Sequence, residues 1–218
     1  MFELDSRGLL QCTAWREWEW LDHGFSTRHS ANWLEKANLA SLKQVHGDVV
    51  IAANHRGLQG EADALITREP GLYVAVRTAD CFPILLVDPK RRAIAAVHCG
   101  WRGTLAGLAR KTVPSLADQF GSRPEHLHAA LGPGIGACCF EVGPEVAQQF
   151  GRMGRAKIDL AGELAEQLAS AGLPQAQISV STDCTLCRPD LYWSYRREGQ
   201  SAGRMWSGIA VRAGREER

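Results

Sequence analysis

The stretch Leu72–Gly103 most constrains the fold of this chain, because it carries reactive side chains just after two apolar runs. The runs Leu72–Val76 and Ala93–Val97 are bounded by polar and glycine residues, which is typical of buried strands. Cys81 comes shortly after the first run, and His98 follows the second run directly. Because strands are rigid, their ends can hold a metal or a nucleophile in place. The stretch therefore predicts a functional site at the ends of two strands.

The rest of the chain predicts a mixture of short strands and helices. Further predicted strands are Val49–Ile51, Leu127–Leu131 and Ile178–Thr182. Predicted helices are Ala31–Leu42, a helix from an N-cap at Thr104 to Gln119, Pro144–Phe150 and Asp159–Ala171. No linker, repeat or low-complexity segment divides the chain. We therefore expect residues 1–212 to form a single domain and residues 213–218 to form a disordered tail.

Composition excludes several classes of partner. The 218 residues can bury one sizeable core, and a net charge of +1 provides no electrostatic reason to expect nucleic acid or an acidic membrane surface. No apolar run approaches the roughly 20 residues of a membrane helix, and the N-terminal stretch has no signal-peptide pattern. The seven cysteines suggest no disulfide framework. We expect a cytoplasmic protein with neither nucleic acid nor membrane as a partner.

His46, Cys81 and His98 are the best candidates for metal ligands, since each lies next to a predicted strand. A structural zinc site would usually show four ligands in close pairs, whereas three dispersed ligands suit a catalytic site with one open position. Thiolate with imidazole favours zinc, with copper as the main competitor. The same residues allow a metal-free alternative in which Cys81 is a nucleophile and His98 its base.

The pattern of the remaining cysteines and glycines predicts neither a second metal site nor a dinucleotide-binding loop. Cys184 and Cys187 form a single C-x-x-C without a second pair or nearby histidines, so we expect them to pack and to line the site. Of the adjacent Cys138 and Cys139, at least one is expected in the core. The glycine-rich stretch Gly132–Val146 does not have the G-x-G-x-x-G spacing, so it does not indicate a dinucleotide loop.

Two arginines are candidates for binding an anion. Arg102 lies where the turn Gly100–Gly103 leads into a predicted helix, and a strand, a glycine turn and a helix N-terminus together suit phosphate. Arg28 follows the predicted turn at His23 and could bind an anion at a strand end. For both arginines a structural role in a loop is the alternative.

Several strings of the sequence resemble the bacterial laccase-domain family. They are KQVHGD, ADALIT, RTADCFPILL, AAVHCGWRGT, GPGIGACCFEVG, and SYRREG followed by GRM. The strings occur in the order found in the family, and the resemblance extends from about His23 to Val211. Members of this family are named polyphenol oxidases or peptidoglycan editing factors and are better described as purine nucleoside phosphorylases with adenosine deaminase activity.

The resemblance implies an α+β fold in which mixed β-sheets are sandwiched between helices. It implies two interleaved subdomains of the four-layer α/β/β/α type. It also implies one zinc ion, held by the histidine of QVHG, the cysteine of TADC and the histidine of VHCGWRG. In this sequence those residues are His46, Cys81 and His98.

The resemblance further implies roles around that metal. It places Arg28 and Arg102 near the substrate or phosphate, and Arg102 is also a candidate catalytic residue. Gln44 is a further candidate for substrate binding. Asp80 is next to Cys81 and is a candidate catalytic residue that could move a proton or orient a ligand, with a structural role as the equal alternative. This chain departs from the family between GFSTR and QVHG, where only His29–Lys43 remains of a usually longer segment. That segment helps to form one wall of the pocket, so the departure bears on substrate preference.

The expected function is zinc-dependent phosphorolysis of a purine nucleoside, such as adenosine, inosine or methylthioadenosine, together with deamination of adenosine. The expected partners are the nucleoside and phosphate, and the expected state is a monomer or weak homodimer. Copper-dependent polyphenol oxidation is one alternative, although a multicopper oxidase needs many more histidines than the seven here. A hydrolase of peptidoglycan precursors and a non-enzymatic scaffold are the others.

Overall fold

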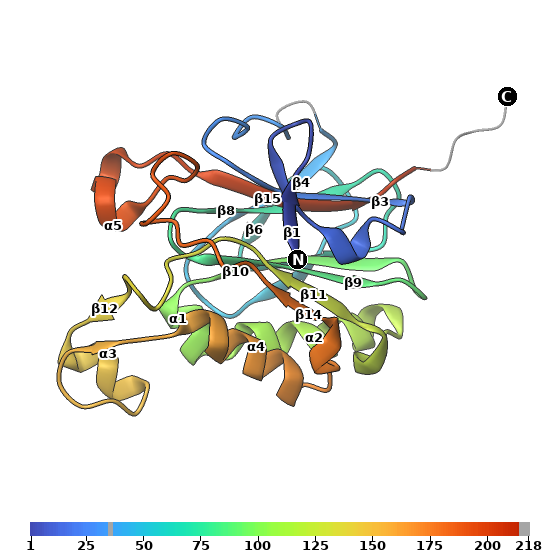
Figure 1. The fold of residues 1–218 in the computed structure, drawn as a ribbon. Coiled ribbons are helices and arrows are strands. Elements are labelled where there is room, and N and C mark those ends of the chain that lie inside the picture. The colour runs from blue at the N-terminus through green and yellow to red at the C-terminus, as the bar shows by residue number, and fades with distance from the viewer. Residues whose placement is uncertain (35–36, 214–218) are drawn as a thin grey trace, which may run out of the picture.

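Two β-sheets lie face to face in the computed structural model, which describes residues 1–34 and 37–213 (Figure 1). Residues 214–218 of the predicted tail and residues 35–36 of the predicted helix Ala31–Leu42 lie outside the described residues. Within the described residues, every helix is too short or too polar to cross a membrane.

The larger sheet has seven strands in the order β1-β2-β3-β15-β8-β4-β6. These strands are β1 Phe2–Leu4, β2 Leu9–Cys12, β3 Leu21–Ser26, β15 Met205–Val211, β8 Tyr73–Thr78, β4 Leu39–Lys43 and β6 Gly57–Glu61. The strand predicted at Leu72–Val76 is β8, so that prediction is confirmed. Because β8 pairs antiparallel with β15 and parallel with β4, the sheet is mixed.

The smaller sheet has six strands in the order β14-β11-β9-β10-β7-β5. They are β14 Ile178–Val180, β11 His128–Leu131, β9 Phe82–Asp88, β10 Ala93–Cys99, β7 Ala64–Thr67 and β5 Val50–Ala52. The predicted strand Ala93–Val97 is confirmed as β10, but the sequence did not predict β9, its neighbour. Pro83 argues against a central strand, yet it lies at the second position of β9, where the strand begins and proline is tolerated.

Helices cover the outer face of the smaller sheet (Figure 1). The covering helices are α1 Trp101–Leu105, α2 Leu108–Phe120 and α4 Leu160–Ser170, whereas α3 Pro144–Gln149 and α5 Tyr195–Glu198 lie to one side of the sheets. Short 3-10 turns are η1 Thr13–Trp15, η2 Pro124–His126, η3 Gln175–Gln177 and η4 Gly199–Ser201, and β12 Glu141–Val142 pairs with β13 Ala156–Lys157. The predicted helix Asp159–Ala171 is confirmed as α4, and the Asp159 carboxylate caps it by accepting from Gly162 N–H at 3.0 Å.

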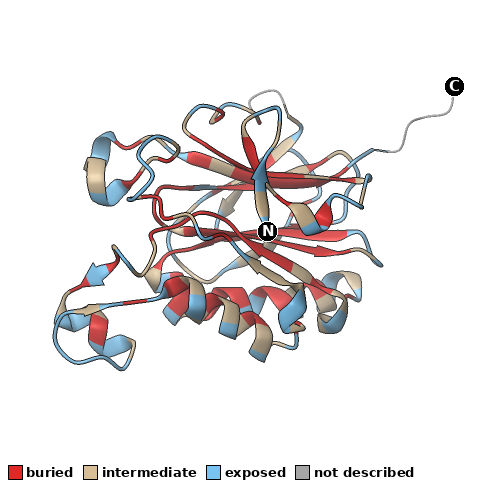
Figure 2. Ribbon diagram, viewed as in Figure 1, coloured by how far each residue is buried: buried red, intermediate tan, exposed pale blue. Residues whose placement is uncertain are grey.

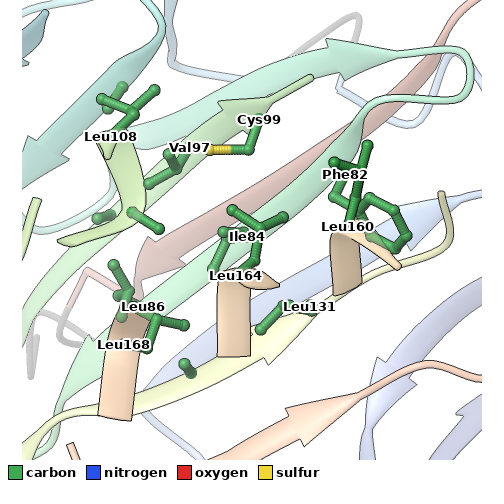
Figure 3. Packing of buried hydrophobic residues seen from close by; sticks show 14 of the residues in the cluster. Phe82, Ile84, Leu86, Val97, Cys99, Leu108, Leu131, Leu160, Leu164 and Leu168 are labelled. Carbon is green, nitrogen blue, oxygen red and sulfur yellow. The ribbon is translucent and has the colours of Figure 1, made fainter. Parts of the chain in front are cut away.

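Two apolar cores result from this layering. Figure 3 shows the first, where Leu160, Leu164 and Leu168 of α4 pack with strand residues such as Ile84 and Leu86. The second core lies between the sheets, where apolar side chains of β8 and β15 meet those of β9 and β10. The central strands of both sheets, such as β9 and β10, are therefore buried, whereas edge strands such as β1 and β6 are not (Figure 2).

The outer face of the larger sheet is covered differently. Residues 31–34 form turns, and Leu34 packs so closely on Gly208 of β15 that an added Cβ there would lie 2.8 Å from its side chain. The mixed-sheet α+β class is thus confirmed, while the described part of this face is covered by a short non-helical segment. The helix predicted over Ala31–Leu42 is wrong, because strand β4 occupies Leu39–Lys43. Pairing of β4 with β8 and β6 outweighs the weak helical periodicity.

The helix predicted from Thr104 to Gln119 is present but begins earlier and is interrupted. It starts at Trp101 as α1 and resumes as α2 after Gly107, whose φ of 74° breaks the helical path. Thr104 is therefore not an N-cap. Its hydroxyl lies inside α1 and donates to the Gly100 carbonyl at 3.0 Å.

Candidate active site

The side chains of His46, Cys81 and His98 meet at one edge of the two sheets. Their ligand atoms all lie within 4.8 Å of one another. His46 follows β4, Cys81 lies between β8 and β9, and His98 is on β10, so three separate elements each supply one group. The structure thus brings together the three residues that the sequence singled out as metal ligands.

Asp63, which is fully buried, orients this cluster from behind. Its carboxylate accepts a hydrogen bond from His98 Nδ1 at 2.7 Å. The same carboxylate accepts backbone N–H bonds from Val45, His46 and Gly47 at 3.2, 3.0 and 2.6 Å. One buried anion therefore fixes both the ring of His98 and the loop that carries His46. Because Nδ1 of His98 is used in this bond, Nε2 is the nitrogen left for a metal.

Sequence reasoning missed Asp63, although it lies within the ADALIT string. A carboxylate behind a metal-binding histidine is a common arrangement, since it orients the ring and raises its basicity. The string therefore contained the signal, but only the fold shows that Asp63 faces both histidine-bearing segments.

The backbone is strained at two residues of the site. His46 has a φ of 60° and Asp80 a φ of 83°, in the left-handed region that residues other than glycine rarely adopt. Such conformations cost about 1–3 kcal/mol each and persist where surrounding contacts fix them. At His46 the fixing contacts are the hydrogen bonds to Asp63.

The surroundings of Cys81 and His98 favour the charged form of each side chain. Burial favours the neutral thiol of Cys81, but hydrogen bonds from His46 and His98 outweigh it and lower the pKa of Cys81 to about 6. Burial disfavours the charged imidazole of His98, but its bonds to Asp63 and Cys81 raise the pKa of His98 to about 9. Cys81 is thus poised as a thiolate, the form that binds metals and acts as a nucleophile.

Gly100 makes room for the cysteine. An added Cβ at this position would lie 2.8 Å from Cys81 Sγ and 3.6 Å from His46 Cδ2. The φ of Gly100 is −88°, so glycine is required here by close packing and not by backbone conformation. A soft thiolate and two imidazoles with one open side fit a transition metal such as zinc or copper.

The open side of the cluster faces a cavity of about 910 Å³. Its lining includes Trp101, Ile135, Phe140 and Tyr195, which supply apolar and aromatic surface. Its basic lining residues are Lys43, Arg77, Arg102, Arg196 and Arg204, and its one acidic lining residue is Asp80. A cavity of this size accommodates a small organic molecule, and its excess of cations favours an anionic one.

Four arginines of the cavity have no carboxylate partner among the residues that the structure describes. No ion pair among residues 1–34 and 37–213 involves Arg77, Arg102, Arg196 or Arg204, whereas Lys43 pairs with Glu61 at 2.6 Å. Arg102 instead lies over the ring of Trp101, with its guanidinium carbon 4.2 Å from the ring centroid. Sequence reasoning did not select Arg77, Arg196 or Arg204, although RTADC, SYRREG and GRM contain them.

Asp80 is held by the C-terminal part of the chain. One carboxylate oxygen accepts from Thr185 Oγ1 at 2.6 Å, and the other accepts from Ser194 Oγ at 3.0 Å and from Arg196 N–H at 2.7 Å. Asp80 thus joins the turn before Cys81 to the segment that carries Arg196 into the cavity.

Gln44 and Arg28 are the other two residues selected from the sequence. The Gln44 side chain lines the cavity, but its amide exchanges two hydrogen bonds of 2.8 Å with the backbone of Arg77. Arg28 does not line the cavity. Its guanidinium carbon lies 3.9 Å from the centroid of Trp193, and it donates to the Pro189 carbonyl.

The cysteines outside this site differ from expectation. Cys138 is exposed, whereas Cys139 is partly buried and packs against the first core without being enclosed by it. The structure brings both close to Cys184 and Cys187, so the single C-x-x-C has a second cysteine pair beside it. Sequence spacing could not predict that the two cysteine pairs meet, because they are far apart along the chain.

Comparison with known proteins relates the chain to one family. The family model described as multi-copper polyphenol oxidoreductase laccase matches residues 26–212. A purine nucleoside phosphorylase from Deinococcus radiodurans is 42% identical over 184 residues, which are 80% of this chain and 70% of that protein. Adenosine deaminase RL5, from an unknown prokaryotic organism, is 38% identical over 161 residues, which are 67% of this chain and 61% of that protein.

A solved structure shares the fold over almost its full length. The crystal structure of YlmD from Geobacillus stearothermophilus superimposes with a TM-score of 0.90 at 26% sequence identity, and the match covers 97% of this chain and 99% of that one. The mixed-sheet α+β architecture is therefore shared with that protein.

Proposed function

This chain belongs to the multi-copper polyphenol oxidoreductase laccase family, and we propose that it is a zinc-dependent purine nucleoside phosphorylase that also deaminates adenosine. The observation that carries the proposal is the cavity, in which a His–Cys–His cluster adjoins arginines that no carboxylate of the described residues neutralises. Relatives named for both activities support it.

Arginines of the cavity supply the phosphate site in this proposal. Arg102 lines the cavity together with Cys81 and His98 and lies two residues after Gly100, which packs against Cys81, so an anion bound by Arg102 lies beside the metal centre. A guanidinium can bind two phosphate oxygens at once and offset their charge. Phosphate positioned in this way attacks the anomeric carbon of the nucleoside, and the bond from that carbon to the purine breaks. The products are ribose 1-phosphate and the free base.

Aromatic side chains supply the purine site. Trp101, Phe140 and Tyr195 line the same cavity, and flat rings suit a flat base through stacking. Tyr195 is half-exposed and lies at the start of α5, so this part of the wall is open to the solvent from which a substrate enters.

His46, Cys81 and His98 are the proposed zinc ligands, and Asp63 is the residue that positions His98. A zinc ion held there would act as a Lewis acid and would lower the pKa of water, the chemistry that deamination at purine C6 requires. Asp80 is proposed to position the cavity wall, because its carboxylate oxygens already accept three hydrogen bonds. Gln44 is proposed to hold Arg77, and Arg28 to brace the segment at Trp193.

Copper-dependent phenol oxidation remains the alternative that the family description suggests. The chain has one H-x-H pair, His126 and His128, which is the motif that copper clusters use repeatedly. His126 Nε2 lies 2.9 Å from Lys90 Nζ, and the His128 ring packs against Trp18. Both histidines therefore have other contacts, and neither lines the cavity. The observation that favours the nucleoside is the positive charge beside the metal cluster, which no carboxylate of residues 1–34 and 37–213 neutralises and which phenol oxidation does not need.

The proposal is tested by incubating the zinc-loaded protein with adenosine, with and without phosphate, and identifying the products. Adenine that forms only with phosphate, together with ribose 1-phosphate, is the expected result. Inosine that forms without phosphate is expected from deamination. Release of free ribose would indicate a hydrolase, and turnover of a phenol by the copper-loaded protein without any nucleoside product would favour the oxidase.

Replacing Arg102 by alanine is expected to weaken phosphorolysis more than deamination. The change removes a charge-assisted contact worth about 1.5–3 kcal/mol, which is roughly a tenfold to hundredfold effect. Deamination uses water in place of phosphate, so it is expected to change less. The measurement is the phosphate dependence of each rate at constant zinc content.

Arg68→Ala is the matched control, because Arg68 also lies over an aromatic ring, with its guanidinium carbon 6.0 Å from the Phe120 centroid, but outside the cavity. It is expected to leave both rates unchanged. An equal fall of phosphorolysis and deamination in Arg102→Ala would assign Arg102 to the support of the cavity and not to phosphate.

A further inference from the structure

Four cysteines form a compact cluster that does not itself line the cavity. Cys138 and Cys139 lie in the loop between β11 and β12, and Cys184 and Cys187 lie in the segment between β14 and α5. Their sulfur atoms all lie within 4.8 Å of one another. Sγ of Cys187 is 3.4 Å from Sγ of Cys139 and 3.7 Å from Sγ of Cys138.

These spacings are those of a tetrathiolate metal site. Zinc–sulfur bonds of about 2.3 Å in a tetrahedron separate neighbouring ligand sulfurs by about 3.8 Å. A disulfide would instead need two sulfurs at about 2.05 Å. Cys187 Sγ lies within 3.7 Å of the sulfurs of two different cysteines, which suits a shared central ion better than a pairwise bond.

The backbone around the cluster is built to hold it. Gly134 and Cys184 form an isolated parallel bridge, and Thr185 N–H donates to the Gly134 carbonyl at 3.0 Å. Gly136 N–H donates to Cys184 Sγ at 3.2 Å, a contact that stabilises a thiolate. An added Cβ at Gly136 would lie 3.3 Å from both Cys138 Sγ and Cys184 Cβ, so glycine allows the two cysteine segments to approach.

We propose that Cys138, Cys139, Cys184 and Cys187 bind a zinc ion as a second metal site, closed by four thiolates and structural in role. Four ligands in two close pairs are the pattern of such sites, and soft thiolates select zinc over calcium or magnesium. The four thiols lose their protons when the ion binds. This site is separate from the His46–Cys81–His98 cluster and does not depend on the proposed reaction.

The proposed ion would stabilise one wall of the cavity by linking two segments that carry lining residues. Ile135 and Phe140 flank the first cysteine pair and line the cavity. The second pair is followed by Arg197, whose guanidinium donates to the carbonyls of Thr185 and Leu186 at 3.1 Å. The metal therefore joins the segment carrying Phe140 to the segment that continues into Tyr195 and Arg196. Loss of the ion is expected to raise the KM for a substrate that binds in the cavity more than it lowers kcat.

The test is a titration of the reduced, metal-free full chain with cobalt, followed by zinc. Cobalt held by four thiolates shows a much stronger sulfur-to-metal charge-transfer absorption than cobalt held by one thiolate and two imidazoles. The double variant Cys138→Ser/Cys187→Ser is expected to lose the strong absorption and one equivalent of metal. Cys81→Ser is expected to keep the strong absorption and to lose the weaker signal. The matched control Cys12→Ser, at a buried cysteine of the other core, is expected to keep both.

Native protein provides a readout that needs no variant. Cys138 and Cys187 are exposed, so a thiol reagent is expected to modify them slowly in the zinc-loaded chain and fast after a strong chelator is added. Cys187→His, which retains a ligating group, is expected to keep the metal with an altered spectrum. Two results would overturn the proposal: equal metal content in the double variant and the native chain, or disulfides among these cysteines in protein that was purified without oxidant.

Discussion

Cys81→Ala is expected to remove the metal from the His46–Cys81–His98 cluster and to depress phosphorolysis and deamination together by at least about a hundredfold. Cys81 is the one thiolate of this cluster, and loss of a ligand weakens binding more than the tenfold to hundredfold effect typical of the groups behind the ligands. Both activities fall because both depend on the same centre. Metal analysis and the two product assays measure the result.

Cys12→Ala is the matched control for this variant. Cys12 is fully buried in the core between the sheets and does not line the cavity. The Cys12→Ala substitution is expected to lower the free energy of unfolding by about 1 kcal/mol and to leave metal content and both activities intact. A Cys81→Ala protein that keeps its metal and both activities would contradict the assignment of Cys81 as a ligand.

A chelator separates the two roles that Cys81 can have. If Cys81 is a nucleophile with His98 as its base, the metal-free native chain stays active and Cys81→Ala does not. If Cys81 is a metal ligand, the metal-free chain loses activity, and zinc restores it in the native chain but not in the variant. We expect the second outcome, because the open side of the cluster offers a position for substrate or water.

Asp63→Ala is expected to be the most damaging substitution behind the metal centre. It removes the acceptor of the His98 ring and of three backbone N–H groups, and these donors would be left without a partner. Unsatisfied buried groups cost about 1–3 kcal/mol each, so the free energy of unfolding is expected to fall by about 3–5 kcal/mol. Metal affinity is expected to fall by about tenfold to hundredfold, since His98 and the loop of His46 lose their orientation.

Urea unfolding of the metal-free chain measures the stability change, and competition with a coloured chelator measures the affinity. Asp63→Asn keeps the volume and is expected to retain part of the stability, but its amide cannot accept all four hydrogen bonds. Asp48→Asn is the control on the same loop, because Asp48 is partly exposed and its one ion pair among the described residues is with Lys111. Native metal affinity in Asp63→Asn would show that Asp63 does not position the ligands.

Much of the candidate site could be predicted from local sequence. Cys81 and His98 were found because each comes just after an apolar run that forms a strand, and the histidine of QVHG precedes another. Asp63, Arg196 and Arg204 lie within strings that were recognised, but nothing in those strings states what the side chains contact. Asp63 faces His98 only because β10 pairs with β7 in a register that puts Ala64 opposite Val97.

By itself, the sequence determined the residue types available for chemistry, the strands that carry two of the ligands, and helix α4, one of the helices that cover the smaller sheet. Those features depend on short-range periodicity and on neighbours in the chain. The tertiary structure decided that β9 is a central strand despite Pro83, that Leu39–Lys43 pairs as a strand, and that four arginines share one cavity. It also decided that two distant cysteine pairs meet. The physical reason is that burial and strand pairing act between segments far apart in sequence, and their free energies outweigh the weak local preferences from which a sequence is read.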